Sequence, residues 1–323
     1  MAELAPGQRL DQYELVAELA RSGMATLYRA IDHESGRTVV LKIPHLQFES
    51  DIAFHERFLR EEAIGQRLDH PAIVKVLTPK SKSRMYIAME YVQGQPLREW
   101  LRRTPQLPID TAVALAIQIA DALVYLHAHD VVHRDLKPEN VMITPYERVK
   151  LMDFGIALDT TQRKMTWGKL SQTFGTPDYM APEQLKGQRG DARTDIYSLG
   201  AMLYEMLTGV VPFPHDNVYA SMHAKGAEDP TPPRQIRPEI PPALEETVLH
   251  ALERDPAKRQ ESAFQLREEL AHPDSVIITG RAARQPDTHR LSAGARTWLT
   301  VVGWAAAGAA FILGFVVLVH VLR

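Results

Sequence analysis

The chain has 323 residues, which is more than one average domain and leaves room for two lobes and a further segment. Hydrophobic residues make up 45% and charged residues 24%, a composition typical of globular rather than disordered proteins. The net charge of −3 gives no reason to expect nucleic acid as a partner, and the lack of cysteine excludes disulfides, zinc–thiolate sites and thiol nucleophiles.

Three predicted strands open the chain. Apolar residues recur at every second position over residues 13–19, which is the period of a half-buried strand. A turn then leads to a returning strand at residues 26–31. A second turn, with Gly36 near its end, leads to a third strand at residues 38–43, which carries Lys42.

A helix is predicted at residues 51–68. It ends before Pro71, because proline disfavours helical backbone in the residue that precedes it. Two adjacent acids, Glu61 and Glu62, lie roughly 100° apart around such a helix. Two further strands are predicted at residues 73–77 and 85–89, followed by a connection at residues 90–94.

Residues 111–127 predict a second helix, apolar on almost every face. Such a helix is buried in a protein core. Gln118, Asp121 and His127 interrupt it too often for a membrane span.

The stretch at residues 131–142 carries the strongest chemical signal. It places a carboxylate (Asp135), an ammonium (Lys137) and an amide (Asn140) on one short loop, and a second carboxylate, Asp153, follows. Phosphoryl transfer from ATP requires these parts: a carboxylate to orient the attacking hydroxyl, a cation near the moving phosphoryl group, and oxygen ligands for Mg²⁺.

The remainder of the polar chain predicts loops and three more helices. Residues 153–183 hold many hydroxyl side chains together with basic residues. Residues 230–242 are rich in proline and predict an extended surface connection. The helices are expected at residues 194–208, 243–252 and 262–270.

A different composition begins after His272. Residues 273–295 are polar, whereas residues 298–321 contain no Asp, Glu, Lys or Arg. Twenty-four helical residues extend roughly 36 Å, enough for the ~30 Å hydrocarbon layer of a membrane. Arg281, Arg284, Arg290 and Arg296 precede this segment, which predicts that the preceding domain is cytoplasmic.

The loop at residues 131–142, the Asp153-Phe154-Gly155 turn and the Ala181-Pro182-Glu183 stretch together resemble protein kinases, over about residues 13–270. The resemblance implies an α+β fold with a small β-rich N-lobe and a large, mainly helical C-lobe, to which one C-terminal transmembrane helix is added. The expected boundaries are a kinase domain at residues 13–272 (N-lobe about 13–89, C-lobe about 93–272), a polar linker at 273–297 and a transmembrane helix at 298–321.

The resemblance also assigns roles. Asp135 would accept the proton of the attacking hydroxyl, Lys137 would neutralise the moving phosphoryl group, and Asn140 and Asp153 would hold Mg²⁺, with Mn²⁺ as a substitute. Lys42 would bind the ATP phosphates and pair with Glu61. Glu62 is the alternative partner, and the acid that does not pair is expected to be an ordinary exposed charge.

The phosphate-binding turn departs from the family pattern. In place of Gly-x-Gly-x-x-Gly the chain has Ala20, Ser22 and Ala25, and it keeps Gly23 between them. Small side chains preserve close approach to phosphate but stiffen the backbone. The main chain of Glu90 and Val92 would bond adenine, with Met89 behind it. The remaining residues expected around the nucleotide are Leu19, Leu27, Val40 and Met142.

Other residues would organise the large lobe. Arg134 would pair with a phosphorylated residue of the activation loop, with Thr173 the first choice, then Ser171 and Thr166. Lys137 and Thr176 together resemble the Ser/Thr class. Glu183 would form a buried ion pair with Arg259, and Asp195 would accept bonds from the backbone of His133 and Arg134.

The resemblance therefore implies a serine/threonine protein kinase of the bacterial membrane-anchored type, which uses ATP, phosphorylates proteins and autophosphorylates. A pseudokinase that acts as a nucleotide- or partner-binding scaffold is the alternative, favoured by the altered glycine loop. A small-molecule kinase is a lesser rival, opposed by the full-length activation segment. Ala306, Ala310 and Gly314 recur every four residues and suggest a homodimer through the membrane segment.

Overall fold

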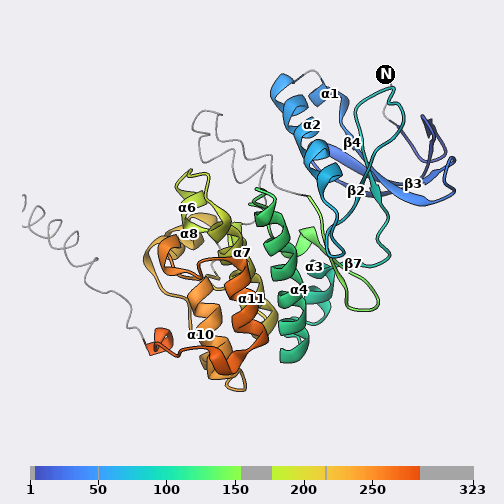
Figure 1. The fold of residues 1–323 in the computed structure, drawn as a ribbon. Helices are drawn as coiled ribbons and strands as arrows, with labels where there is room; N and C mark the ends of the chain where they lie inside the picture. Colours follow the sequence, from blue (N-terminus) through green and yellow to red (C-terminus); the bar gives the residue numbers. More distant parts are fainter. Residues whose placement is uncertain (1–3, 50, 154–176, 215–216, 284–323) are drawn as a thin grey trace, which may run out of the picture. The chain divides into compact units, whose positions relative to one another are not determined.

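A β-rich small lobe and a helical large lobe make up the described part of the protein (Figure 1). This computed structural model describes residues 4–49, 51–153, 177–214 and 217–283. The predicted membrane span at 298–321, the expected phosphorylation sites Thr173, Ser171 and Thr166, and the activation-loop residue Thr176 lie outside the described residues.

The small lobe is built on an antiparallel sheet with strand order β1-β2-β3-β4-β6-β5. The three opening strands are confirmed as β2, β3 and β4. The strand expected at residues 73–77 is shorter, because Ile73 instead bridges to Leu151 of the large lobe. The strands are β1 (Arg9–Leu10), β2 (Tyr13–Arg21), β3 (Ala25–Asp32), β4 (Thr38–Pro44), β5 (Val76–Leu77) and β6 (Ile87–Glu90).

Helix α2 (Ile52–Arg67) packs on this sheet and confirms the helix predicted at residues 51–68. The Asp51 carboxylate caps its N-terminus by accepting a hydrogen bond from the Phe54 amide at 3.0 Å. Phe54 and Phe58, one turn apart, bury their rings against Ile87. A Cβ at Gly65 would lie 2.3 Å from Val76, so glycine lets the helix approach β5 closely.

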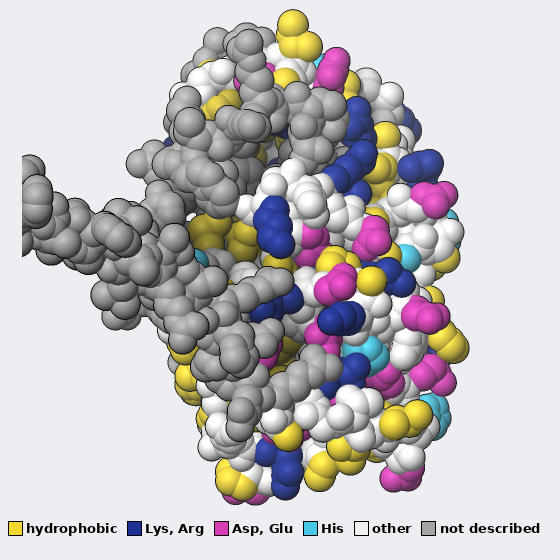
Figure 2. Space-filling view, turned by 90° about the vertical axis from the view of Figure 1, so that its left-hand side faces the viewer, with side chains coloured by type: hydrophobic (Ala, Val, Ile, Leu, Met, Phe, Trp, Pro, Cys, Tyr) yellow, Lys and Arg dark blue, Asp and Glu magenta, His cyan; other side chains and the backbone are white. Residues whose placement is uncertain are grey.

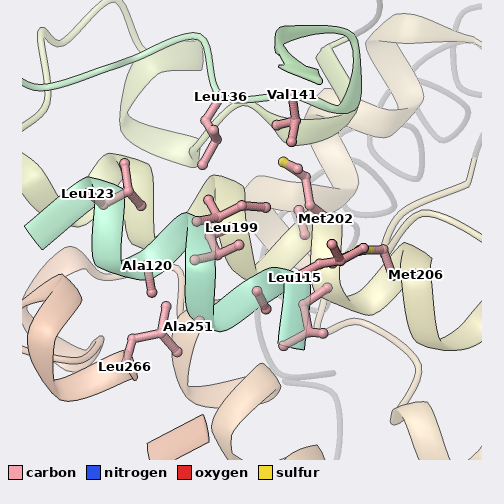
Figure 3. Close-up of a cluster of buried hydrophobic side chains, with 14 of the residues drawn as sticks. Leu115, Ala120, Leu123, Leu136, Val141, Leu199, Met202, Met206, Ala251 and Leu266 are labelled. Atoms are coloured by element: carbon pink, nitrogen blue, oxygen red, sulfur yellow. The ribbon is translucent and has the colours of Figure 1, made fainter. Parts of the chain in front are cut away.

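The large lobe is organised around α4 (Ile109–Ala128) and α7 (Ala192–Thr208), with α10 (Pro242–Ala251) and α11 (Ala263–Ala271) beside them. Figure 3 shows Leu115 and Leu123 of α4 beside Leu199 and Met202 of α7. By length and composition alone α4 is the single helix of the described part that could cross a membrane, and its apolar side chains form this core.

Shorter elements complete the described chain. Near the lobe junction these are α1 (Leu46–Glu49), β7 (Gln95–Pro96), α3 (Leu97–Arg103), η1 (Pro138–Asn140), β8 (Val141–Ile143) and β9 (Val149–Leu151). Farther along the chain they are η2 (Pro177–Tyr179), α6 (Pro182–Leu185), α8 (Val218–Ala227), α9 (Pro233–Ile236), η3 (Pro256–Lys258), η4 (Pro273–Ser275) and η5 (Arg281–Ala283).

Two segments are more ordered than their composition predicts. The proline-rich connection includes the single turn α9, and Arg237 next to it donates hydrogen bonds to the Leu107 and Leu207 carbonyls at 2.8 and 3.0 Å. The start of the expected polar linker also packs on the large lobe, where Arg281 forms an ion pair with buried Glu246 at 2.5 Å. The compact unit accordingly continues to Ala282.

The described surface carries charges of both signs. On the face shown in Figure 2, Lys and Arg side chains lie interspersed with Asp and Glu. This mixture agrees with the near balance of 37 basic and 40 acidic residues in the sequence.

Candidate active site

Three charged side chains from distant parts of the chain meet between the lobes. Lys42 Nζ of β4 lies 2.7 Å from Glu61 Oε1 of α2 and 2.8 Å from Asp153 Oδ1, which follows β9. Glu61, and not Glu62, is therefore the partner of this lysine. The cluster joins both lobes through one ammonium group.

The electrostatics of this cluster keep Lys42 and Asp153 charged, whereas burial raises the pKa of Glu61. Burial acts to lower the pKa of Lys42, but the carboxylates of Asp153 and Glu61 outweigh burial and raise that pKa. The Lys42 ammonium in turn holds the pKa of Asp153 below its usual range. A protonated lysine and an ionised carboxylate thus coexist at neutral pH.

Glu62 corrects one expectation. The acid that does not bind Lys42 was expected to be an ordinary exposed charge, yet Glu62 is buried. Its carboxylate pairs with Lys82 and accepts a bond from Gln66 at 3.1 Å. Glu62 therefore anchors a neighbouring side of α2 to Lys82, a contact that helical spacing alone does not reveal.

The strand register sets which side chains lie beside Lys42. Leu27 pairs directly with Lys42, and Val40 pairs with Met89. Residues directly opposite each other, and residues two apart on one strand, share a face of a sheet. Leu27, Val40 and Met89 therefore lie on the same face as Lys42, which is the arrangement expected around an adenine ring.

The connection between the lobes is fixed by its side chains. The Glu90 carboxylate binds the Lys150 ammonium at 2.5 Å and accepts the Lys75 amide at 3.0 Å, while the Glu90 amide donates to the Lys75 carbonyl. Among the described residues, no backbone group is bonded to the Val92 amide. Across the connection, Met142 of β8 pairs with Pro96 of β7.

Asp135, Lys137 and Asn140 form one bonded group on the loop between α4 and β8. Lys137 Nζ lies 2.9 and 2.7 Å from the two carboxylate oxygens of Asp135. Asn140 Nδ2 donates to the Asp135 backbone carbonyl at 2.8 Å and to its carboxylate at 3.0 Å. The Asp135 side chain is still 34% exposed, so a hydroxyl group can reach it.

The Asp195 side chain of α7 fixes the backbone of this loop. Its buried carboxylate accepts the His133 and Arg134 amides at 2.9 and 2.8 Å, as predicted, and it also lies 2.8 Å from His127 Nε2. Arg134 has φ of 62° and Asp153 has φ of 55°, in the left-handed region that non-glycine residues seldom adopt. Such backbone persists where neighbouring groups enforce it, and it is frequent at functional sites.

Asn140 and Asp153 are suited to hold Mg²⁺. The Asn140 side-chain nitrogen donates to Asp135, which leaves the Asn140 side-chain oxygen as the atom that can ligate a metal ion. The Met152 amide donates to the Asn140 carbonyl at 3.0 Å. This bond holds Asp153, the next residue along the chain, close to Asn140. Mg²⁺ prefers oxygen ligands and is held in proteins by one or two carboxylates together with substrate phosphates.

The end of the activation segment is fixed to the large lobe by a buried ion pair. Arg259 Nη2 lies 2.7 Å from Glu183 Oε2, and a second bond of 2.8 Å joins Nη1 to Oε1. The Thr194 hydroxyl donates to the same carboxylate at 2.9 Å. The predicted pairing of Glu183 with Arg259 is thus present in bidentate form.

Arg98 links the candidate catalytic loop to this region, a contact that the sequence did not predict. Its Nε binds Glu139 at 2.9 Å, Nη1 binds Glu205 at 2.8 Å, and Nη2 donates to the Tyr179 hydroxyl. These partners lie 41, 107 and 81 residues away along the chain. Because the partners lie so far apart along the chain, no local spacing in the sequence indicates this cluster.

Comparisons with known proteins agree with this geometry. A family model described as "protein kinase domain" matches residues 13–273. A probable serine/threonine-protein kinase of Streptomyces coelicolor is 41% identical over 264 residues, covering 80% of this chain and 39% of that protein. The serine/threonine-protein kinase PknB of Mycolicibacterium smegmatis is 36% identical over 271 residues, covering 82% and 43%. The chain thus spans about two fifths of the length of these curated relatives.

Solved structures show the same fold. The kinase domain of Mycobacterium tuberculosis PknI is 28% identical and has a TM-score of 0.65, with 84% of this chain and 100% of that chain covered.

Proposed function

Since this chain belongs to the protein kinase family, we propose that it transfers the γ-phosphate of ATP to serine and threonine residues of proteins. The observation that carries the proposal is the contact of Lys42 with both Glu61 and Asp153. That contact joins the two lobes and brings a phosphate-binding cation to the carboxylate that follows β9.

Asp135 and Lys137 serve the transfer itself. The Asp135 carboxylate orients the attacking hydroxyl and accepts its proton, because it is exposed enough to receive a side chain from a substrate. The Lys137 ammonium, held at 2.7 Å from Asp135, lies where it can neutralise negative charge near the attacked phosphorus. Asn140 keeps the loop in this arrangement.

Nucleotide binding follows the sheet face described above. Leu27 and Val40 would cover one side of adenine and Met142 the other, while the Glu90 carbonyl and the Val92 amide would bond its edge. Leu19, Ala20, Ser22, Gly23 and Ala25 would cover the phosphates. Asn140 and Asp153 would hold Mg²⁺, or Mn²⁺ in its place, and the bound ion would supply positive charge to the phosphates.

The decisive experiment is a phosphotransfer assay with radiolabelled ATP on the full chain. Unaltered protein should phosphorylate itself and a protein substrate in the presence of Mg²⁺. Asp135→Asn should abolish transfer and retain ATP binding, because it removes the proton acceptor alone. ATP binding without any transfer by the unaltered protein would instead indicate a pseudokinase.

Phosphorylation of the activation loop would switch the enzyme on. Arg134 immediately precedes Asp135, and a phosphate opposite an arginine adds charge and strong acceptor oxygens. Thr173 is the first candidate, followed by Ser171 and Thr166. Mass spectrometry of active protein should find phosphate between residues 160 and 176, and its absence there would refute this regulation.

Residues 298–321 would anchor the kinase in a membrane. Twelve of these residues are Leu, Ile, Phe or Val. At about −0.3 to −0.6 kcal/mol each, they favour insertion by roughly −4 to −7 kcal/mol. The arginines before the segment favour a kinase domain on the cytoplasmic side, and Ala306, Ala310 and Gly314 would offer a surface for homodimer formation.

The anchor is tested by fractionation. Full-length protein should remain with membranes through an alkaline carbonate wash, whereas a version that ends at Ala293 should be soluble and still active. Release of the full-length chain by the wash would refute the anchor.

A further inference from the structure

The turn between β2 and β3 is closed by a serine side chain. Ser22 Oγ accepts hydrogen bonds from the Met24 amide at 3.3 Å and the Ala25 amide at 3.0 Å. The same hydroxyl donates to the Ala25 carbonyl at 2.9 Å, which also accepts the Ser22 amide at 2.9 Å. Ser22 thus binds the far side of its own turn through both backbone and side chain.

These bonds use most of the turn's backbone donors. The amides of Ser22, Met24 and Ala25 all have partners within the turn. Within the described part of the chain, only the Gly23 amide of this turn has no bonded partner. A Cβ added at Gly23 would meet nothing within 4 Å, and its φ is not positive, so the folded chain itself does not require glycine there.

We propose that the Ser22 hydroxyl occupies the Met24 and Ala25 amides in the place of a phosphate oxygen, so that the turn offers ATP little more than the Gly23 amide. The inference rests on the proposed function, because it concerns how the same site binds the phosphates of ATP. Backbone amides at a turn are natural phosphate donors, and bonds to an ionised oxygen are roughly twice as strong as bonds to a neutral one. Ser22 therefore weakens phosphate binding by the turn. It acts as a specificity-determining residue that lowers the affinity for ATP relative to adenosine.

The position of the turn does not depend on this hydroxyl alone. The Met24 carbonyl accepts the His45 amide at 2.9 Å, and the Met24 side chain packs against the cluster of Phe54, Phe58 and Ile87. Thr26 is linked to the His45 ring at 3.0 Å. Removal of the Ser22 hydroxyl should thus free two amides while the turn stays in place.

The test compares the binding of ATP with that of adenosine, which has no phosphate. Calorimetric titrations would use the full chain, purified in detergent, with Ser22 unaltered or replaced in Ser22→Ala and Ser22→Thr. Ser22→Ala should tighten ATP about tenfold, the change that 1.4 kcal/mol produces, and leave adenosine unchanged. Ser22→Thr keeps a hydroxyl and should restore the original ratio of the two affinities.

A matched control lies in the next turn of the same sheet. Ser35 Oγ donates to Asp32 Oδ2 at 2.7 Å between β3 and β4, so Ser35→Ala removes a turn hydroxyl away from the site and should leave both affinities unchanged. ATP binding that stays constant or weakens in Ser22→Ala, with adenosine unchanged, would overturn the inference and leave the proposed function intact. Failure of every variant and of the unaltered chain to bind either ligand would overturn both.

Discussion

Two clusters of oppositely charged side chains differ in exposure and geometry. One lies at the candidate active site and the other inside the large lobe. In the large lobe, Arg259 and Glu183 are 0% and 7% exposed and meet in bidentate geometry. Near the lobe junction, Lys42 and Glu61 are each 18% exposed, Asp153 is 36% exposed, and the contacts of Lys42 are single bonds.

The number of partners differs as well. Arg259 also donates to the Glu253 and Arg193 carbonyls, so that its guanidinium is saturated. Lys42 carries one charge and shares it between two carboxyl groups, so that neither of them has a cation of its own. Removing one partner of a saturated, buried pair destabilises the fold, because the other charge is left buried without compensation. An unsaturated, accessible cluster can instead exchange partners with a ligand.

The largest effect on stability should come from breaking the large-lobe pair. Arg259→Leu leaves Glu183 buried without its partner, which should lower the free energy of unfolding by about 3–5 kcal/mol. Urea denaturation measures this change. A loss below about 1 kcal/mol would mean that the pair contributes no more than a surface contact.

The same pair predicts a pH dependence. Burial acts to raise the pKa of Glu183, but the hydrogen bonds from Arg259 outweigh burial and lower that pKa from its ordinary 4.5. The stability that the carboxylate contributes is therefore complete above pH 4.5 and is lost as the pH falls further. Urea midpoints from pH 7 to pH 3 should show this acid-dependent loss in the unaltered protein and a shallower one in Glu183→Gln.

Lys42→Met should show the reverse pattern. It removes a cation that acts on phosphate, which should lower kcat/KM for ATP by about 10²–10³-fold. The free energy of unfolding should change by less than about 1 kcal/mol, because the cluster is partly exposed. Kinetics and urea denaturation on one preparation check both parts, and an unfolded variant would contradict the contrast.

The two adjacent acids of α2 sharpen the contrast within one helix. Glu62→Ala removes the contacts to Lys82 and Gln66 and should cost about 1–2 kcal/mol of stability, with most activity retained. Glu61→Ala should retain stability and lose activity. Thermal unfolding and phosphotransfer assays on the two variants would disprove the division of roles if their effects were equal.

The smallest expected effect concerns the start of that helix. Asp51→Ala removes the cap on the Phe54 amide and should destabilise the small lobe by about 1 kcal/mol. Asp51→Asn retains an oxygen acceptor and serves as its matched control. Hydrogen exchange in the first turn of α2 should accelerate in Asp51→Ala alone.

Local patterns in the sequence predicted much of the fold. Alternating apolar residues located β2, the two turns that follow located β3 and β4, and the proline at position 71 marked the end of α2. The grouping of Asp135, Lys137 and Asn140 on one short loop was also predicted, whereas their mutual hydrogen bonds were not. The contact of Lys42 with Glu61 was expected from the family resemblance rather than from any physical pattern.

Long-range contacts between side chains escaped prediction. The burial of Glu62 depends on Lys82 in a separate loop, and Arg98 meets partners on three other segments. The attachment of Arg281 to Glu246 was missed because the segment that carries it is polar. Polar composition predicts exposure, and only the folded chain shows which polar groups find buried partners.

The buried carboxylate of Asp195 affects how fast neighbouring backbone amides exchange their hydrogens with water. It accepts the amides of His133 and Arg134 and is itself 0% exposed between α4 and α7. Those two amides can reach water only when the helices around Asp195 separate, which is an event of the whole large lobe. Their deuterium uptake should therefore be among the slowest in the protein, although they belong to the candidate catalytic loop, whose Asp135 is solvent-accessible. The exchange rate of these two amides would therefore report the opening of the large lobe rather than the motion of the loop.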